Sequence, residues 1–125
     1  MAKEDRQRIE AIKAAVEADP GRVDAPDEEG HPPLHRAVID RYSSLLGWLL
    51  DRGADPNVRN ARGETTLHVA AIFDRTPDRH ILRTLIRRGA DPNARREDGT
   101  APLHVAAGYG DLATLEALLE GGADP

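Results

Sequence analysis

Three histidines at one recurring position are the residues of this chain most able to do chemistry. His35, His68 and His104 each follow a leucine, at intervals of 33 and 36 residues. Imidazole nitrogens bind transition metals, but a shared site needs every ligand about 2 Å from one ion. If the recurring segments fold into units that stack side by side, their equivalent histidines lie a whole unit apart, which is too far for one ion. His31 precedes His35 by four residues but falls in a turn, so the two need not share a helix face. We expect no metal and no cofactor.

Side chains suited to nucleophilic catalysis are scarce. The chain has no cysteine, which excludes thiolate nucleophiles, disulfides and zinc ribbons. Ser43 and Ser44 precede an apolar run, where serine is a common helix cap. The sequence contains no GxSxG, HExxH, GxGxxG or Walker-type segment. The acidic groups around residues 28–29 and 97–98 flank turn glycines, where side chains point to solvent. We therefore expect no catalytic residue and no enzyme activity.

Composition favours a single all-helical domain with no nucleic-acid partner. A chain of 125 residues that is 39% apolar and 31% charged has room for one folded domain. Only four residues are aromatic, so Leu, Ile, Val and Ala must build the core. The net charge of −5 disfavours phosphate binding. The charged start MAKEDRQRIE is unlike a signal peptide, and no apolar run approaches the roughly 20 residues of a membrane span. We expect a cytoplasmic location and no membrane partner.

Two landmarks recur along the chain and define its units. The segments GHPPLHRAV, GETTLHVAA and GTAPLHVAA begin at Gly30, Gly63 and Gly99, which are 33 and 36 residues apart. The segment GADP begins at Gly53, Gly89 and Gly122, which are 36 and 33 residues apart. The 36-residue interval is the second one in the first set of glycines but the first one in the second set. This difference arises because the middle unit carries three extra residues, around residues 74–78. A period of this size indicates a repeat architecture.

Each unit should contain two helices. After the turn glycine a thin, alanine-rich helix begins, with Thr65 as a cap in the second unit and proline at an early position in the others. The second helix carries apolar residues at helical spacing, such as Leu45, Leu46, Leu49 and Leu50. It should end at a glycine in the left-handed conformation, followed by Asp-Pro.

These residues resemble the ankyrin repeat, whose signature T-P-L-H-x-A and period of about 33 residues they share. The resemblance implies an all-α solenoid of stacked helix-turn-helix units joined by β-turn fingers. We divide its single domain, 1–125, into a degenerate N-terminal cap repeat (1–26), repeat 1 (27–59), repeat 2 with the insertion (60–95) and a truncated repeat 3 (96–125). In the cap, the face carrying residues such as Lys3 and Glu17 is polar, as an end facing water should be.

The resemblance also implies structural roles for six residues. The histidines after leucine should tie each turn to its neighbour by buried hydrogen bonds, and the three glycines should cap the second helices. These structural residues are His35, His68, His104, Gly53, Gly89 and Gly122. Two departures stand out in the first unit. Pro32 replaces the threonine cap, and Arg36 stands where Val69 and Val105 stand in the other units.

Ankyrin-repeat proteins generally bind other proteins through the turns and first helices on a concave face. The positions of this chain that match are Glu29, His31, Ile39, Asp40, Arg62, Glu64, Ile72, Phe73, Asp98, Thr100 and Tyr109. Ile72, Phe73 and Tyr109 are apolar where many repeats are polar, so they are the leading anchors. Phe73 has an alternative role, covering the base of the insertion. We expect Trp48 to pack between repeats, and the acidic turns favour a partner with basic groups at its rim.

Two functions remain open from the sequence. The first is a protein-interaction scaffold that binds another protein, whose identity the sequence does not give. The second is a self-associating structural or regulatory module cut from a longer ankyrin-repeat protein. The last helix has no polar outer face. Self-association would therefore use the C-terminal repeat.

Overall fold

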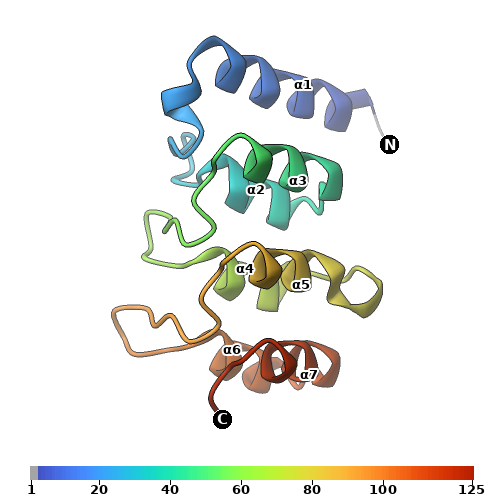
Figure 1. Cartoon of the computed structure of the whole chain (residues 1–125), viewed down its shortest axis with the longest axis vertical. Helices are drawn as coiled ribbons and strands as arrows, with labels where there is room; N and C mark the ends of the chain where they lie inside the picture. The colour runs from blue at the N-terminus through green and yellow to red at the C-terminus, as the bar shows by residue number, and fades with distance from the viewer. Residues whose placement is uncertain (1–2) are drawn as a thin grey trace.

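A computed structural model describes residues 3–125 as a stack of antiparallel helix pairs (Figure 1). The helices are α1 (Lys3–Ala18), α2 (Pro33–Ile39), α3 (Ser43–Asp51), α4 (Thr66–Phe73), α5 (His80–Arg87), α6 (Pro102–Tyr109) and α7 (Leu112–Glu120). Short 3₁₀ turns lie at Pro20–Arg22 and Pro77–Arg79. No strand occurs within these residues, so the all-helical prediction is confirmed. Met1 and Ala2 of the expected cap lie outside the described residues.

The core is built by the aliphatic residues whose helical spacing predicted it. The second helices bury their leucine or isoleucine faces against the first helices of the same unit. The alanine-rich first helices α2, α4 and α6 pack on one another in turn. Large side chains with at most 2% exposure include Leu34, Leu45, Leu46, Leu49, Leu67, Ile81, Leu82, Leu85 and Leu118. Because each unit contacts only its neighbours, burial in this core depends on the stacking.

Left-handed glycines end the second helices and start the fingers. Gly53, Gly89 and Gly122 have φ of +92°, +105° and +105°, values that side chains with a Cβ rarely adopt. The amide that follows each glycine closes the helix, as when Ala54 donates to the Leu49 carbonyl at 3.0 Å. The chain then leaves the stack and forms the fingers, which project to the left in Figure 1.

Side-chain hydrogen bonds link successive units close to these glycines. Asn57 accepts the Asp91 amide at 2.7 Å and donates to the Gly89 carbonyl at 3.0 Å. Asn93 repeats the pattern with the Asp124 amide and the Gly122 carbonyl. In the cap, Asp24 accepts the Asp55 amide at 3.1 Å but has no N–H to donate. The cap therefore joins the stack through the same contact with one hydrogen bond fewer.

Buried histidines join the first helices α2 and α4 to the finger of the next unit. His35 Nε2 lies 2.8 Å from the Glu64 carbonyl oxygen, and His68 Nε2 lies 2.7 Å from that of Thr100. His68 Nδ1 accepts the Thr65 amide at 3.2 Å, so its proton is on Nε2 and is donated to the carbonyl. His35 and His68 are fully buried, whereas His104 is exposed at the end of the stack.

The first unit lacks one hydrogen bond of this arrangement. His35 Nδ1 is buried without a partner, because the residue three positions earlier is Pro32, which has no amide proton. We expect Pro32→Thr to supply both an N–H for His35 and a hydroxyl cap for α2. A buried acceptor that gains a partner contributes about 1–2 kcal/mol, partly offset by the greater freedom of the unfolded chain. Urea denaturation should show a net gain of about 1 kcal/mol.

Pro32→Ala is the matched control for this prediction, because it restores the amide without the hydroxyl. It should fall between the wild type and Pro32→Thr. A Pro32→Thr protein that is less stable than Pro32→Ala would contradict the proposed cap.

Polar contacts hold α1 on the first helix pair. Asp5 accepts the Tyr42 hydroxyl at 2.7 Å, and Arg8 pairs with Asp40 at 3.0 Å. Burial, with the bond to Asp5, raises the pKa of the Tyr42 hydroxyl to about 12. Trp48 is half-buried against the core. The Arg52 guanidinium lies 4.4 Å from the centroid of its ring, so this side chain also faces cationic groups.

The expectation that Ser43 and Ser44 cap a helix is wrong. The residue at the cap position of α3 is Tyr42, and no side chain accepts a cap hydrogen bond there. Arg41, with φ of +57°, turns the chain so that the helix begins at Ser43 itself. A serine inside the first turn cannot act as the N-cap residue, and Ser43 Oγ instead lies 2.9 Å from His80 Nε2.

Candidate functional site

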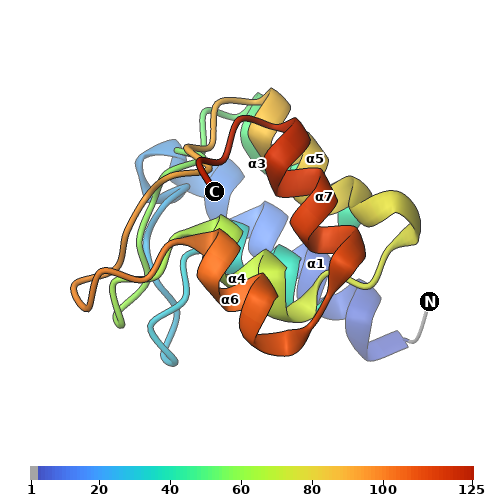
Figure 2. The same ribbon diagram turned by 90° about the horizontal axis from the view of Figure 1, so that it is seen from below.

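The fingers and the first helices share one side of the stack, which we call the inner face. Figure 2, which looks along the stack, shows the fingers extending at an angle to α4 and α6. The inner face consists of the finger residues 27–31, 61–64 and 97–100 and the exposed sides of α2, α4 and α6. Neighbouring fingers contact one another, since the Ala61 amide donates to the Gly30 carbonyl at 3.0 Å. Gly30 has φ of +85°, and a Cβ there would lie 2.6 Å from the Ala61 Cβ.

Internal ion pairs occupy most acidic residues expected to meet a partner. Arg36 contacts Glu29 at 2.8 Å, while Arg96 contacts Glu64 and Asp98, both at 3.4 Å. The Thr100 amide, together with Arg96, lowers the pKa of the exposed Asp98 carboxyl. Arg96 was not among the residues predicted to lie at the inner face. Arg96 and Glu64 lie in different units, and only the stacking of these units brings the two side chains together. Their spacing in the sequence therefore did not indicate an ion pair.

Other candidate residues of the fingers make structural contacts as well. The His31 amide donates to Asp27 at 3.0 Å, and the Thr100 carbonyl accepts the hydrogen bond from His68. Asp40, at the end of α2, pairs with Arg8 of α1. Arg62 is exposed and forms no ion pair within residues 3–125. It is the charged candidate that has no other role.

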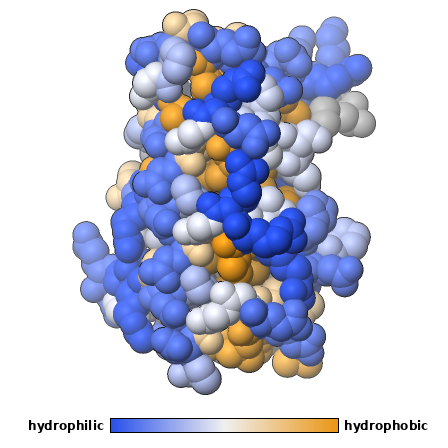
Figure 3. All heavy atoms as spheres, viewed as in Figure 1, coloured by the Kyte–Doolittle hydropathy of each residue, from blue (hydrophilic) through white to orange (hydrophobic). Residues whose placement is uncertain are grey.

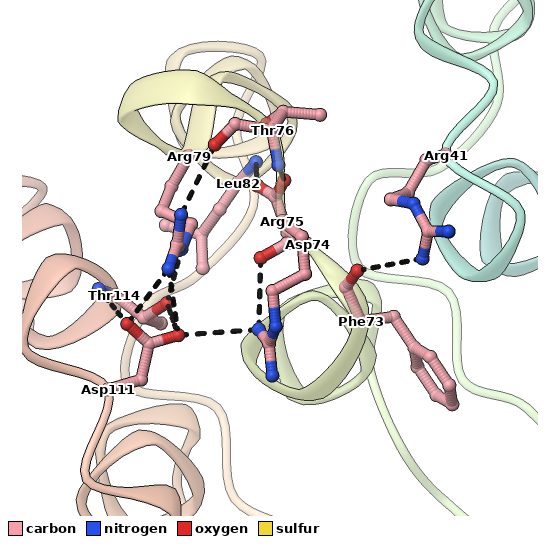
Figure 4. Close-up of polar contacts among 9 residues, drawn as sticks. All are labelled: Arg41, Phe73, Asp74, Arg75, Thr76, Arg79, Leu82, Asp111 and Thr114. Carbon is pink, nitrogen blue, oxygen red and sulfur yellow. Dashed lines mark hydrogen bonds and ion pairs between the residues drawn. The ribbon is translucent and has the colours of Figure 1, made fainter.

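The apolar candidates lie at the ends of the first helices. Ile39 and Ile72 are half-buried, whereas Phe73 is 38% exposed and Tyr109 is 62% exposed. Phe73 and Tyr109 occupy the last positions of α4 and α6, which stack on one another. Figure 4 shows the Phe73 ring pointing away from Asp74, Arg75 and Thr76. The ring is thus directed toward the surface and not into the inserted segment.

The segment between α4 and α5, residues 74–79, contains the three-residue insertion and forms a polar clamp next to Phe73 (Figure 4). The fully buried Asp74 carboxylate accepts the Leu82 amide of α5 and the Thr76 amide, both at 2.9 Å. It thereby caps α5. Arg41 of the preceding unit donates to the Phe73 carbonyl at 3.4 Å. The end of α4 is therefore held from both sides.

The same segment also reaches the next unit. Arg75 and Arg79 contact Asp111 at 3.3 Å and 3.1 Å, and Asp111 caps α7 through the Thr114 amide. Asp111 lies two residues after Tyr109, so these ion pairs fix the turn beside that ring. The sequence located the insertion but carried no signal for its partners, because they lie 32–36 residues away.

The stacking also brings Ser43 and His80 together, a pair of the kind used in nucleophilic catalysis. Their side chains are 2.9 Å apart, although the sequence separates them by 37 positions. Both lie near the surface, and within residues 3–125 no carboxylate hydrogen-bonds the second ring nitrogen of His80. Without that third group the imidazole is not oriented as a base. The pair is a structural contact between α3 and α5.

Two surface cavities flank the inner face. One of about 330 Å³ lies between the second and third fingers and is lined by charged side chains that include Arg62, Arg96 and Glu97. A groove of about 690 Å³ runs between α1 and α2, with Ile12 and Ala15 on one side and Arg36 on another. In the described part of the chain no group of three or more His, Asp or Glu residues could hold a metal. Among these residues no helix has the length and apolarity needed to cross a membrane.

Comparison with known proteins matches this architecture. Residues 34–125 match the family described as ankyrin repeats in three copies. The chain is 49% identical over 45 residues to an ankyrin repeat-containing protein of Schizosaccharomyces pombe, a stretch that covers 36% of this chain and 22% of that protein. It is 51% identical over 39 residues to ankyrin repeat domain-containing protein 46 of Danio rerio, covering 31% and 17%. The matched part of the chain thus covers about a fifth of the length of each of these relatives.

Proposed function

We propose, because this chain belongs to the ankyrin-repeat family, that it binds another protein through its inner face. Ankyrin repeats are generally protein–protein interaction modules, and their fold is a non-enzymatic interaction fold. The observation that carries the proposal is the pair Phe73 and Tyr109, which end the stacked helices α4 and α6 and are the exposed large apolar residues of these two helices. Aromatic residues of this kind supply much of the binding energy in protein interfaces.

We also propose how the chain divides into units. The cap covers residues 1–26, and three units cover 27–59, 60–95 and 96–125. The helix pairs α2–α3, α4–α5 and α6–α7 fall within these three units in turn. Each unit therefore contributes one finger and one first helix to the inner face.

The charges of the inner face favour a partner segment with basic groups beside an apolar anchor. Arg36 and Arg96 are already paired, whereas Glu28 and Glu97 at the fingertips form no ion pair within residues 3–125. The chain as a whole carries a net charge of −5. Exposed charges of this kind affect the association rate more than the final affinity. We expect binding to slow as the salt concentration rises.

Site-specific crosslinking tests the proposal before the partner is known. A photoreactive phenylalanine analogue is placed at Tyr109 of α6. In a parallel sample it is placed at Arg87, an exposed residue of the second helix α5, which is not part of the inner face. If the inner face binds, a protein will be crosslinked from position 109 and not from position 87. Equal crosslinking from both positions, or from position 87 alone, would overturn the proposed face.

Calorimetry with the captured partner then measures the anchors. Phe73→Ser and Tyr109→Ser should each weaken binding about 10- to 30-fold, the range for a residue that contributes about 1.5–2 kcal/mol. Arg87→Ser is the matched surface control and should leave affinity unchanged. Both anchors are exposed, so circular dichroism should show intact helices. Wild-type affinity in both variants would contradict their role.

A further inference from the structure

The inner face exposes different charges at its two ends. At the fingertips, Glu28 and Glu97 carry exposed carboxylates that form no ion pair within residues 3–125. Figure 3 shows hydrophilic residues covering the second and third fingers, at the left of the molecule. At the other end, where the first helices end, the exposed side chains of Arg41 and Arg75 lie beside the two aromatic residues. We call these two residues the arginine pair.

The carboxylates that follow the two aromatic residues in the chain are covered. Asp74, directly after Phe73, is fully buried. Asp111, two residues after Tyr109, has a side chain that is 11% exposed and contacts Arg79 at 3.1 Å. A ligand that reaches the two rings therefore meets guanidinium groups before it meets carboxylates.

Arg41 occupies a backbone conformation that suits glycine. Helices α2 and α6 end in the same way, with a left-handed residue after the last turn. This residue is Arg41 in the first unit, with φ of +57°, and Gly110 in the third, with φ of +66°. In both units its amide donates to the carbonyl three residues earlier at 3.1 Å. A side chain with a Cβ is strained in this conformation, and strain of this kind is concentrated at functional sites.

The fold makes little use of the Arg41 side chain. Its Nη1 donates to the Phe73 carbonyl at 3.4 Å, which is long for a hydrogen bond. Within residues 3–125 it forms no other side-chain hydrogen bond and no ion pair, because the neighbouring Asp40 pairs with Arg8 at 3.0 Å. A guanidinium has five N–H donors, so four remain for a ligand. The single contact keeps them close to Phe73.

Arg75 is the second cation on a carboxylate that already has one. Its Nη1 contacts the Asp74 carbonyl at 3.1 Å and the Asp111 carboxylate at 3.3 Å, but Asp111 is also held by Arg79. The Arg75 side chain is 49% exposed, and its Nε and Nη2 donate to no group within residues 3–125. Figure 4 shows Arg41 on one side of Phe73 and Arg75 on the other.

We propose that the segment which binds the inner face is acidic around its anchor. An apolar side chain of this segment packs on Phe73 and Tyr109, and carboxylates on either side of it bind Arg41 and Arg75. Guanidinium groups suit this role because they bind a carboxylate through two parallel hydrogen bonds. The inference rests on the proposed function and adds the chemistry of the partner. Basic groups that meet the fingertips would lie at the opposite end of the first helices, so the segment carries both charges.

An acidic peptide fits this surface better than a nucleic acid does. Aromatic rings beside arginines can stack on bases, but a nucleic acid brings a phosphate with every nucleotide. The acidic fingertips of the same face and the net charge of −5 would repel such a chain. A peptide can place its carboxylates at the arginine pair alone.

Peptide selection tests the inference without a known partner. A phage-displayed library of random dodecapeptides is selected on the wild type, on Phe73→Ser/Tyr109→Ser and on Arg41→Gly/Arg75→Gln. Peptides that bind the wild type and require the two aromatic residues should carry Asp or Glu beside an aromatic or aliphatic residue. Arg41→Gly/Arg75→Gln should not select them. Asp78→Asn removes an exposed carboxylate from the same segment and is the matched control, which should select the same peptides.

The affinity of a synthetic copy of the selected peptide, together with thermal unfolding, separates binding from structure. Arg41→Gly should weaken binding about 5-fold, because a charge-assisted hydrogen bond is lost. The same change should raise the melting temperature by about 2–4 °C, because glycine relieves the left-handed strain. Arg41→Lys keeps both the positive charge and the strained backbone, so it should lose less affinity and keep the wild-type melting temperature.

The outcomes distinguish this inference from the proposed function. If no selected peptide depends on Phe73 and Tyr109, the proposed function fails and the inference fails with it. Peptides that depend on these residues but are basic or uncharged would leave the proposed function in place and overturn the acidic partner. Wild-type affinity in Arg41→Gly, or tighter binding of a single-stranded oligonucleotide than of the peptide, would also overturn it.

Discussion

Asp74→Ala will lower the free energy of unfolding by about 3 kcal/mol. The Asp74 carboxylate is fully buried and accepts the amides of Thr76 and Leu82, so alanine leaves both donors without a partner. Each buried unsatisfied donor costs about 1–3 kcal/mol, and loss of a helix cap adds about 1 kcal/mol. Relief from burying the carboxylate offsets part of the sum. Urea denaturation followed by far-ultraviolet circular dichroism measures the change.

Two further variants test whether the cap is the cause. Asp74→Asn keeps one acceptor oxygen but places an NH₂ group opposite an amide, so it should lose about half as much stability. Asp78→Asn, exposed in the same segment, should stay within about 0.5 kcal/mol of the wild type. If Asp74→Ala changes stability no more than Asp78→Asn, the clamp does not hold α5.

Acidification from pH 6.5 to pH 4 will cost the protein about 3 kcal/mol through His35. Burial lowers the pKa of His35 to about 4, and its Nδ1 has no hydrogen-bond partner to stabilise a second proton. In the unfolded chain a histidine titrates near pH 6.5. The unfolded state therefore binds more protons in this window, so stability is complete above pH 6.5 and falls as the pH approaches 4. A folded-state pKa one pH unit below the unfolded-state pKa corresponds to about 1.4 kcal/mol.

His35→Gln separates this effect from general acid denaturation. Glutamine can still donate to the Glu64 carbonyl but does not titrate, so its unfolding free energy should change less between pH 6.5 and pH 4. Burial also lowers the pKa of His68, which leaves a residual dependence of the same sign. The lowered pKa values of Asp27, Asp98 and Asp111 add a loss of stability of the same sign that begins near the acidic end of this window, and this loss is common to both proteins. Equal pH profiles for His35→Gln and the wild type would contradict the assignment.

The resemblance to the ankyrin repeat predicted the candidate surface, but it did not predict which of the residues there are available to a partner. Phe73 and Tyr109 were named from their positions in the units, and both side chains are exposed. Glu64 and Asp98 were named in the same way, yet Arg96 occupies them. An ion pair between units depends on the rotation and distance between neighbouring units. A sequence pattern contains the period of the units but not this geometry.

The sequence by itself determined the architecture of this protein. The intervals between Gly30, Gly63 and Gly99 and the leucine spacing of the second helices follow from local physics, since helix periodicity and left-handed caps depend on residues close in the chain. The tertiary structure alone decided the long-range polar contacts. It placed Ser43 against His80 and Arg79 against Asp111. These outcomes depend on which unit lies beside which, because only stacking brings residues more than 30 positions apart within hydrogen-bond reach.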